Sequence, residues 1–380
     1  MPNIRKQAPY FKSEVREVSQ GTLPQADNSS VNSTAFTELQ KLLYEGVNGG
    51  QLFSNPTTST YSLVYTAVAA AAYIGGVLSP NGDIHFVPTN APRGQKVAAN
   101  GTVSTYSLVY TVNNAYIGGV LAPNGDVHFV PANADRGQKI SSAGVVSTYS
   151  LVFTGGLGGS HNGGVLAPNG DIHFVPYWAD RGQKISSAGV VSTYSLIYTA
   201  ANAYYGGVLA PNGDIHFIPF YAAVGQKVAA DGTVSTYSLA YTTTTAYAGG
   251  VLAPNGDIHF VPSRVSVGQK ISSAGVVSTY SLVYTSNTNT PNLGGFLSPN
   301  GDIHFVSHNA NRGQKVAANG TVSTYSLVYT TGNAYAGAVL TQNGDIHFVP
   351  YDSTIGQKIN ANWGVNFDKG ICLHSYFNKF

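Results

Sequence analysis

A segment of fourteen residues, Gly118–Pro131, recurs seven times along this chain of 380 residues with small variations. Successive copies lie 43 or 45 residues apart and begin at Gly75, Gly118, Gly163, Gly206, Gly249, Gly294 and Gly337. Each copy places Asn-Gly between two apolar runs, which is the strongest short-range signal for a β-hairpin because both residues tolerate positive φ. A fixed period of this length with a turn in every copy predicts the blades of a β-propeller.

Each repeat holds four short segments with the character of β-strands. We call them A (Gly-Gly-Val-Leu), B (Asp-x-His-Phe-Val), C (Gly-Gln-Lys followed by Ile or Val) and D (Ser-Thr-Tyr-Ser-Leu-x-Tyr-Thr). Four strands in each repeat of this length make one propeller blade. The paired glycines of segment A suit a crowded channel wall, where backbones approach closely, so A is expected to lie innermost.

The two ends of the repeat array are complementary. The array opens with a D segment, Ser59–Thr66, and its last repeat has segments A, B and C but no D. Pairing the first D segment with Gly356–Ile359 would complete a seventh blade and remove an open sheet edge. The sequence therefore predicts an all-β fold, a single seven-bladed propeller of four-stranded blades over residues 57–360, closed by its N-terminal outer strand.

Two flanking segments fall outside the repeats. Residues 1–56 are predicted to form a polar arm with one short helix over residues 34–47, because Phe36, Leu39, Leu42 and Leu43 fall on one helical face. A helix this short is marginal alone, so that face is expected to anchor the arm to other structural proteins of a larger assembly. The apolar tail, residues 361–380, is expected to pack on the ring or on a neighbouring subunit.

The composition excludes several classes of protein. Charged residues make up 9% of the chain and the net charge is +2 with no basic cluster, so nucleic-acid binding is not expected. No apolar stretch approaches the length of a membrane span, and the single cysteine, Cys372, cannot form an intrachain disulfide. Residues 1–30 lack the apolar core of a secretory signal, so we expect export by another route, such as assembly into a virus particle, or retention in the cell.

Comparing the seven repeats with one another separates constant from variable connections. The A–B and C–D turns barely change, whereas the D–A and B–C loops vary freely, and antiparallel order places these two variable sets on one face. Loops on a rigid scaffold carry function, although drift in loops that touch nothing would give the same pattern. Exposed aromatic residues favour binding. The predicted ligand-binding residues are Tyr177, Trp178, Phe220, Tyr221, Arg264, His308, Tyr351 and His161.

Two charged patterns recur in every repeat. The Asp-x-His pairs, such as Asp83 and His85, could offer metal ligands, but a structural role is favoured because a functional site usually occurs once. In that interpretation the aspartate bonds turn amides, the histidine packs and makes one hydrogen bond, and no metal binds. The lysine of segment C, such as Lys96, is interpreted as a solvated strand end, with a ring of charge for an anionic ligand as the alternative.

The sequence offers little for catalysis. All four glutamates, Glu14, Glu17, Glu38 and Glu45, precede the ring, so no inward pair of glutamates could hydrolyse a glycoside. The chain has no nucleophile elbow, phosphate-binding loop or zinc-ligand spacing. On this basis the chain is predicted not to be an enzyme and to need no cofactor.

The segment Gly163–Pro176 resembles a repeat of bacterial, protist and viral β-propellers, which reads G-G-V-L-x-P-N-G-x-I-x-F-x-P. The resemblance covers all seven repeats and implies the blade architecture. It departs at His85 and its equivalents, where an aromatic residue is common, and in segment C. Those propellers share no single activity, so the resemblance implies a fold and not a function.

These observations together predict a non-enzymatic structural and binding protein. We expect a virion-associated propeller, anchored by its arm, that presents the variable face to a host-surface receptor or glycan and inserts into no membrane. One alternative is a lectin-like adhesin that acts as a free oligomer. Another is an intracellular scaffold for protein interactions. The expected location is the virion or an extracellular surface, with the cytoplasm as the alternative.

Overall fold

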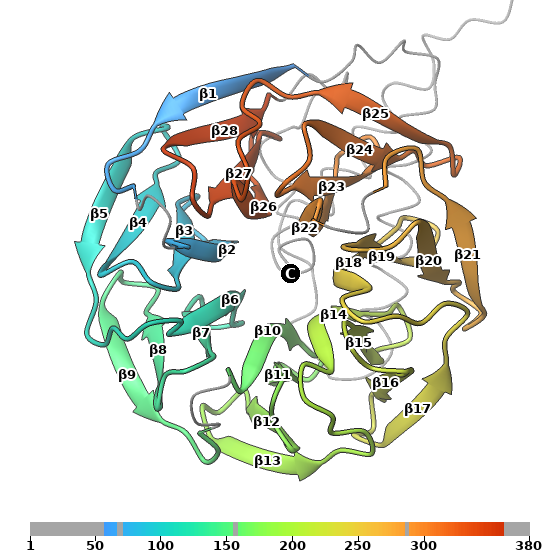
Figure 1. Ribbon diagram of the computed structural model, residues 1–380. Coiled ribbons are helices and arrows are strands. Elements are labelled where there is room, and N and C mark those ends of the chain that lie inside the picture. The colour runs from blue at the N-terminus through green and yellow to red at the C-terminus, as the bar shows by residue number, and fades with distance from the viewer. Residues whose placement is uncertain (1–56, 67–70, 155–158, 286–288, 361–380) are drawn as a thin grey trace, which may run out of the picture.

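The computed structural model describes residues 57–66, 71–154, 159–285 and 289–360, which form seven four-stranded antiparallel sheets around one axis (Figure 1). This confirms the predicted all-β, seven-bladed propeller. The predicted arm and helix over residues 1–56 and the tail over residues 361–380 lie outside the described residues. Within the described ranges, no helix has the length and apolar character needed to cross a membrane.

Every sheet has the order A, B, C, D, and the A strands lie nearest the axis (Figure 1). We number the blades 1 to 7 in the order of their A strands. These strands are β2 (Tyr73–Leu78), β6 (Tyr116–Leu121), β10 (His161–Leu166), β14 (Tyr204–Leu209), β18 (Tyr247–Leu252), β22 (Asn292–Leu297) and β26 (Tyr335–Leu340). The B strands are β3 (Ile84–Pro88), β7 (Val127–Pro131), β11 (Ile172–Pro176), β15 (Ile215–Pro219), β19 (Ile258–Pro262), β23 (Ile303–Ser307) and β27 (Ile346–Pro350). The C strands are β4 (Arg93–Val97), β8 (Arg136–Ile140), β12 (Arg181–Ile185), β16 (Val224–Val228), β20 (Val267–Ile271), β24 (Arg312–Val316) and β28 (Ile355–Ile359). The D strands are β5 (Val103–Ser107), β9 (Val146–Ser150), β13 (Val191–Ser195), β17 (Val234–Ser238), β21 (Val277–Ser281), β25 (Val322–Ser326) and, for blade 7, β1 (Thr58–Ser62).

The ring closes through blade 7, as the repeat pattern predicts. Strand β1 pairs antiparallel with β28, and the register runs from Thr58 opposite Ile359 to Ser62 opposite Ile355. The first and last described residues of the ring also meet, because Asn360 N donates to Thr57 O at 2.8 Å. The strand is shorter than the predicted Ser59–Thr66, and the same early end occurs in every D strand.

A buried glutamine explains why the D strands end early. After β5, the amides of Val109 and Tyr110 leave their own sheet and both donate to Gln138 Oε1 in the next blade, at 2.9 Å each. Gln138 itself is fully buried, so these bonds also give its side-chain oxygen the partners that a buried polar group requires. Each blade carries the equivalent glutamine, at Gln95, Gln138, Gln183, Gln226, Gln269, Gln314 and Gln357. Segment C therefore joins each blade to the one before it.

Neighbouring blades pack through valines that fill the space above a glycine. A Cβ atom on Gly207 would lie 2.8 Å from Val165 Cγ2 and 3.1 Å from Val175 Cγ2 of the preceding blade, too close for a methyl group without movement. Blade 7 has Ala338 at this position, and the valine it would meet is replaced by Phe296, whose ring stacks on His304 at a centroid distance of 4.9 Å. Ala338 packs against the apolar cluster that contains Phe296, so the two departures from the repeat occur at the same contact between blades.

A bulge in each A strand turns one side chain toward the axis. In blade 1, Tyr73 pairs with Pro88 but Gly76 pairs with Phe86, so one extra residue lies on the inner strand. Gly75 takes a φ of 82° within this bulge, which glycine adopts without a Cβ penalty. Ile74 follows Tyr73 and joins its equivalents from other blades in one buried apolar cluster. The side chains that the bulges turn inward therefore line the centre of the ring.

The close approach at Gly207 gives a stability prediction with a matched control. We expect Gly207→Ala to lower the free energy of unfolding by about 1–3 kcal/mol, because the added methyl overpacks the contact between blades 3 and 4. Ala338→Gly, at the equivalent position, should cost no more than about 1 kcal/mol. Denaturant melts of both variants test this, and a Gly207→Ala chain as stable as the unaltered chain would contradict the packing described here.

Candidate functional site

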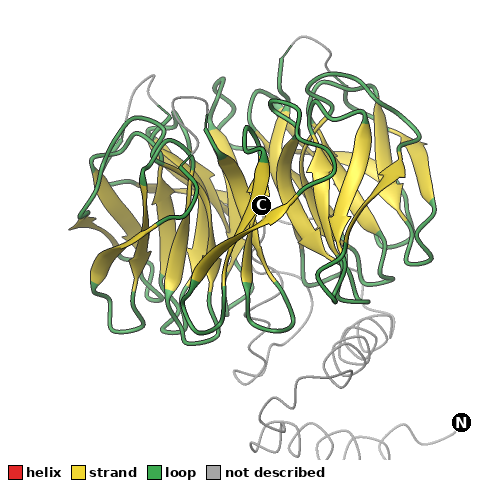
Figure 2. Cartoon of the chain, turned by 90° about the horizontal axis from the view of Figure 1, so that it is seen from below, coloured by secondary structure: helices red, strands yellow, loops and turns green. Residues whose placement is uncertain are grey.

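The variable D–A and B–C loops lie on one face of the ring, and the constant A–B and C–D turns lie on the other (Figure 2). The variable loops are held by backbone bonds between blades. Ala203 N, at the start of blade 4, donates to Tyr177 O in the B–C loop of blade 3 at 3.0 Å, and Ala246 N donates to Phe220 O at 3.0 Å. The side chains on these loops are therefore carried by a fixed backbone.

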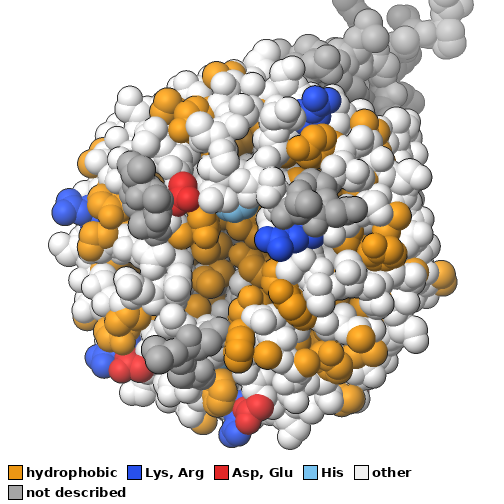
Figure 3. Space-filling view, viewed as in Figure 1, with side chains coloured by type: hydrophobic (Ala, Val, Ile, Leu, Met, Phe, Trp, Pro, Cys, Tyr) orange, Lys and Arg blue, Asp and Glu red, His pale blue; other side chains and the backbone are white. Residues whose placement is uncertain are grey.

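The centre of the variable face is hollowed and lined by apolar side chains (Figure 3). Its floor consists of the residues that the A-strand bulges turn toward the axis: Ile74, Ile117, Asn162, Tyr205, Ala248, Leu293 and Ala336. Three aromatic residues from B–C loops, Tyr177, Phe220 and Tyr351, pack against this floor. We call these ten residues the hollow. Tyr205 joins floor to rim, with its ring 6.3 Å from that of Tyr177 and 5.4 Å from that of Phe220.

Three larger side chains lie exposed one residue further along the B–C loops of blades 3, 4 and 5. Trp178 is 48% exposed and Tyr221 is 41% exposed, and Arg264 is also exposed. The Trp178 indole N–H donates to Asn202 Oδ1 at 2.5 Å, and Arg264 Nε donates to Thr290 Oγ1 at 3.4 Å. We call Trp178, Tyr221 and Arg264 the arc, since they follow three consecutive blades around the hollow.

The other four blades carry a short polar residue where the arc has its large side chains: Asn90, Asn133, Asn309 and Asp352. In three of them the side chain caps the next loop. Asn114 N donates to Asn90 Oδ1 at 2.7 Å, Asn333 N to Asn309 Oδ1 at 2.8 Å, and Ala71 N to Asp352 Oδ1 at 2.8 Å. Each capped residue has positive φ, from 45° to 54°. The cap therefore stabilises an unfavourable backbone conformation.

Two predicted binding residues are buried instead of exposed. His161 is the first residue of β10, where five other blades have a buried tyrosine, and it lies between Phe153 and Phe174 with centroids 6.1 and 5.5 Å away. Its placement in a variable D–A loop is therefore wrong, because the strand begins earlier than the loop pattern indicates. His308 is 7% exposed, and its Nδ1 lies 2.9 Å from Tyr335 O. It supports Tyr351, at a centroid distance of 4.8 Å.

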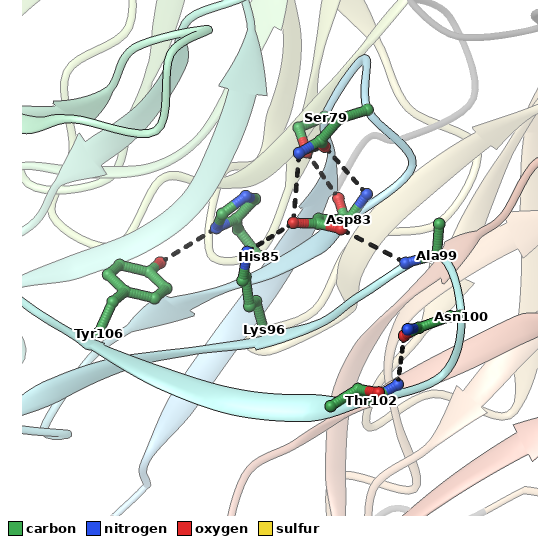
Figure 4. A network of polar contacts seen from close by, with 9 residues as sticks. Ser79, Asp83, His85, Lys96, Ala99, Asn100, Thr102 and Tyr106 are labelled. Atoms are coloured by element: carbon green, nitrogen blue, oxygen red, sulfur yellow. Dashed lines mark hydrogen bonds and ion pairs between the residues drawn. The ribbon is translucent and has the colours of Figure 1, made fainter.

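The constant face has a different character, because its charged groups bond to one another in each blade. Figure 4 shows the network of blade 1, in which Lys96 Nζ donates to Asp83 Oδ2 at 2.7 Å and Ala99 N donates to Asp83 Oδ1 at 3.3 Å. The hydroxyl of Tyr106 lies 3.4 Å from His85 Nδ1. The histidine packs with one hydrogen bond, as predicted. The aspartate bonds a turn amide, but that amide belongs to the C–D turn and not to the A–B turn that the aspartate follows.

The interpretation of the segment C lysines as solvated strand ends is wrong. All seven pair with the aspartate of the preceding B segment at 2.5 to 2.7 Å, because antiparallel pairing sets each lysine opposite the histidine two residues after that aspartate. No group of three or more potential metal ligands occurs within the described ranges. A cavity of about 110 Å³ lies between blades 1 and 2, lined by the Lys96 network on one side and by blade 2 residues such as Val127 and Ile140 on the other. We assign this face to the scaffold.

Comparisons with known proteins identify the fold. No family model and no curated protein matches the chain. Among solved structures it is similar to a streptogramin B lyase, with a TM-score of 0.69 and 21% identity over 82% of this chain and 99% of that one. A catalytically inactive virginiamycin B lyase from Staphylococcus aureus, solved with quinupristin, has a TM-score of 0.69 and 17% identity over 80% of this chain and 100% of that one.

An extracellular domain of a hybrid two-component system from Bacteroides thetaiotaomicron is also similar, with a TM-score of 0.63 and 12% identity over 82% of this chain and 42% of that one. Identities this low establish a shared fold and nothing finer. The chain is thus a seven-bladed β-propeller that shares its fold with lyases and with an extracellular domain of a two-component system.

These neighbours contradict the prediction that the chain is not an enzyme. That prediction rested on missing glutamate pairs and missing catalytic motifs, and on the view that a sevenfold repeat signals a structural role. Lyases that share this fold over their whole length show that a propeller of this kind can carry a catalytic site. We therefore withdraw the exclusion of catalysis, since fold alone fixes neither the presence nor the absence of an activity.

The buried histidines predict loss of stability in mild acid. Burial lowers the pKa of His85, His128, His173, His216, His259 and His347 to about 4, and that of His304 to about 3. The unfolded chain, with histidine pKa values of about 6.5, therefore binds more protons as the pH falls from about 6.5 to 4, so the free energy of unfolding decreases across that range. The pKa values of Asp83, Asp126, Asp171 and Asp257 are lowered from 3.8, so their stabilising contribution is lost only at still lower pH.

Thermal melts between pH 7 and 4 should show a falling Tm. Burial also lowers the pKa of His161 and His308, so nine buried histidines contribute to this slope. His173→Gln, which keeps a polar side chain without a titrating imidazole, should therefore reduce the slope by about one ninth. A Tm that does not change over this range would show that these histidines are not buried in the neutral form.

Proposed function

We propose that this chain is a recognition module that binds a surface glycan through the arc on its variable face. Trp178 and Tyr221 present exposed aromatic rings on adjacent blades, with Asn202 between them, bonded through its side chain to Trp178 and through its carbonyl oxygen to Tyr221 N. Sugar rings have apolar faces that pack on indole and phenol rings and hydroxyl groups that bond to nearby amides, which matches these amphipathic side chains. The arc therefore suits an oligosaccharide lying across two or three blades.

The observation that carries this proposal is the loss of the loop cap in blades 3 and 4. Asn202 and Thr245 have φ values of 56° and 57°, like their capped equivalents, but the residues in the capping position are Trp178 and Tyr221. Tryptophan has no acceptor, and the hydroxyl of tyrosine lies at the far end of its ring. Positive φ is especially costly for a β-branched residue such as Thr245. Strain of this kind, about 1–3 kcal/mol, is commonly retained where function requires it.

We also propose that residues 1–56 join the ring to a larger assembly such as a virus particle. Strand β1, which directly follows these residues, is the outermost strand of blade 7 (Figure 1). An anchor attached there would extend from the outer wall of the ring, and the hollow and the arc would stay uncovered. The low charge of the chain is compatible with dense packing in such an assembly.

The glycan proposal is tested by array screening followed by affinity measurement on the best-bound oligosaccharide. Trp178→Ala should weaken binding about tenfold or more, because aromatic anchors of this type dominate binding energy. Val152→Ala, which removes an exposed apolar side chain from the outer wall, is the control and should leave the Kd unchanged. If the chain bound a receptor protein that carries no glycan, the proposed ligand of the arc would be a protein and not a glycan.

A variant that restores the loop cap in blade 4 distinguishes an effect on glycan binding from an effect on stability. Tyr221→Asn should keep or raise the Tm, because the new side chain can accept a hydrogen bond from Thr245 N worth about 1 kcal/mol. The same variant should lose glycan affinity. If Tyr221→Asn bound normally, or if it were strongly destabilised, the exposed tyrosine would be a packing residue and not a binding residue.

The assembly proposal is tested by a chain that begins at Asn55. Its ring should melt at the same temperature as the full chain, because the described core and the closure by β1 and β28 use no earlier residue. The truncated chain should fail to enter the native particle or oligomer. If the truncated chain were incorporated normally, residues 1–56 would not be needed for assembly and the proposal would be wrong.

A further inference from the structure

The floor of the hollow contains one polar residue among aliphatic and aromatic ones. Of the seven equivalent positions, five carry isoleucine, leucine or alanine, one carries Tyr205, and one carries Asn162. Asn162 is 2% exposed, and its Oδ1 has no hydrogen-bond partner within the part of the chain that the structure describes. An unsatisfied buried carbonyl oxygen costs about 1–3 kcal/mol. The position accepts an apolar residue in five blades, so the fold itself does not require this amide.

The oxygen of the Asn162 amide is the end that lacks a partner among the described residues. Its neighbour on the floor is Tyr205: burial raises the pKa of the Tyr205 phenol, and the nearby Asn162 side chain lowers it by a smaller amount. The hollow therefore holds one unpartnered acceptor oxygen for an incoming N–H or O–H group.

The walls of the hollow favour a planar ligand. Tyr177, Phe220 and Tyr351 lie at the rim position of blades 3, 4 and 7, whereas blades 1, 2 and 5 have the small residues Thr89, Ala132 and Ser263 there. The Tyr177 and Phe220 rings are 6.1 Å apart and inclined by 41°, within the range in which aromatic rings attract one another. A third ring entering from the open side would add edge and face contacts to both.

We infer that the hollow is a second binding site, separate from the arc, that takes a small planar aromatic ligand carrying one N–H or O–H donor for Asn162 Oδ1. Pockets of this kind are mostly apolar, with a few placed polar groups that fix orientation. The site goes beyond the proposed glycan recognition and needs neither Trp178 nor Arg264. Indole is a suitable probe because it has the ring, the size and a single N–H donor.

The test compares indole with N-methylindole, which has the same ring but no donor, by calorimetry or ligand-observed NMR on the full chain. Indole should bind about tenfold more tightly than N-methylindole. In Asn162→Leu the two compounds should bind within about twofold of each other, and blades 2 and 6 show that a large aliphatic residue fits this position. Asn162→Ala, which introduces the residue found in blades 5 and 7, is a second variant with the same expectation.

Val152→Ala, which lies outside both the hollow and the arc, is the matched control and should change neither affinity. Equal affinity of the two compounds for the unaltered chain would overturn the inference, and so would an unchanged preference for indole in both Asn162 variants. Absence of binding by either compound would also overturn it.

Discussion

The contact between neighbouring blades, in which valine methyl groups occupy the space over a glycine, is the constraint on which the whole ring depends. At Gly207 the valines of blade 3 leave no room for a Cβ atom. Where blade 7 has Ala338 at this position, the preceding blade has Phe296 in place of the valine. Six such contacts, together with the variant contact at Ala338, fix how each sheet meets the next. The bulge of the A strand, the buried glutamine of the C strand and the closing strand β1 all act within this arrangement.

The two faces of the ring use polar groups in opposite ways. On the constant face, each aspartate bonds a lysine and each histidine meets a tyrosine hydroxyl, so the polar groups are satisfied internally and repeat in every blade. On the variable face, the repeat is broken where the cap is lost at Trp178 and Tyr221 and where Asn162 enters an apolar floor. Departures from a local rule without a local gain are expected at functional sites, and here they gather around one axis.

Much of the fold could be predicted because the constraint is local and repeated. Asn-Gly turns, alternating apolar residues and the unmatched D segment indicate the seven blades and their closure. The burial and the contacts of the site residues were harder to predict from the repeat pattern. Exposure of Trp178 and Tyr221 follows from loop position, but the burial of His161 depends on where β10 begins. The pairing of Lys96 with Asp83 depends on register between strands, and the role of Asn162 requires knowing that a bulge turns it to the axis. Aligning the repeats at that position would have shown the single asparagine.

The meeting of Thr57 and Asn360 on blade 7 has a consequence for how this ring could be used in a longer polypeptide. Both ends of the ring emerge side by side, so the ring could be inserted into a surface loop of another domain without separating the two halves of its host. For the same reason the ring should tolerate circular permutation: new ends opened at an exposed C–D turn, such as the one at Gly144, with residues 57 and 360 joined by a short linker. The contacts between blades continue around the whole axis, so they do not fix where in the ring the polypeptide begins.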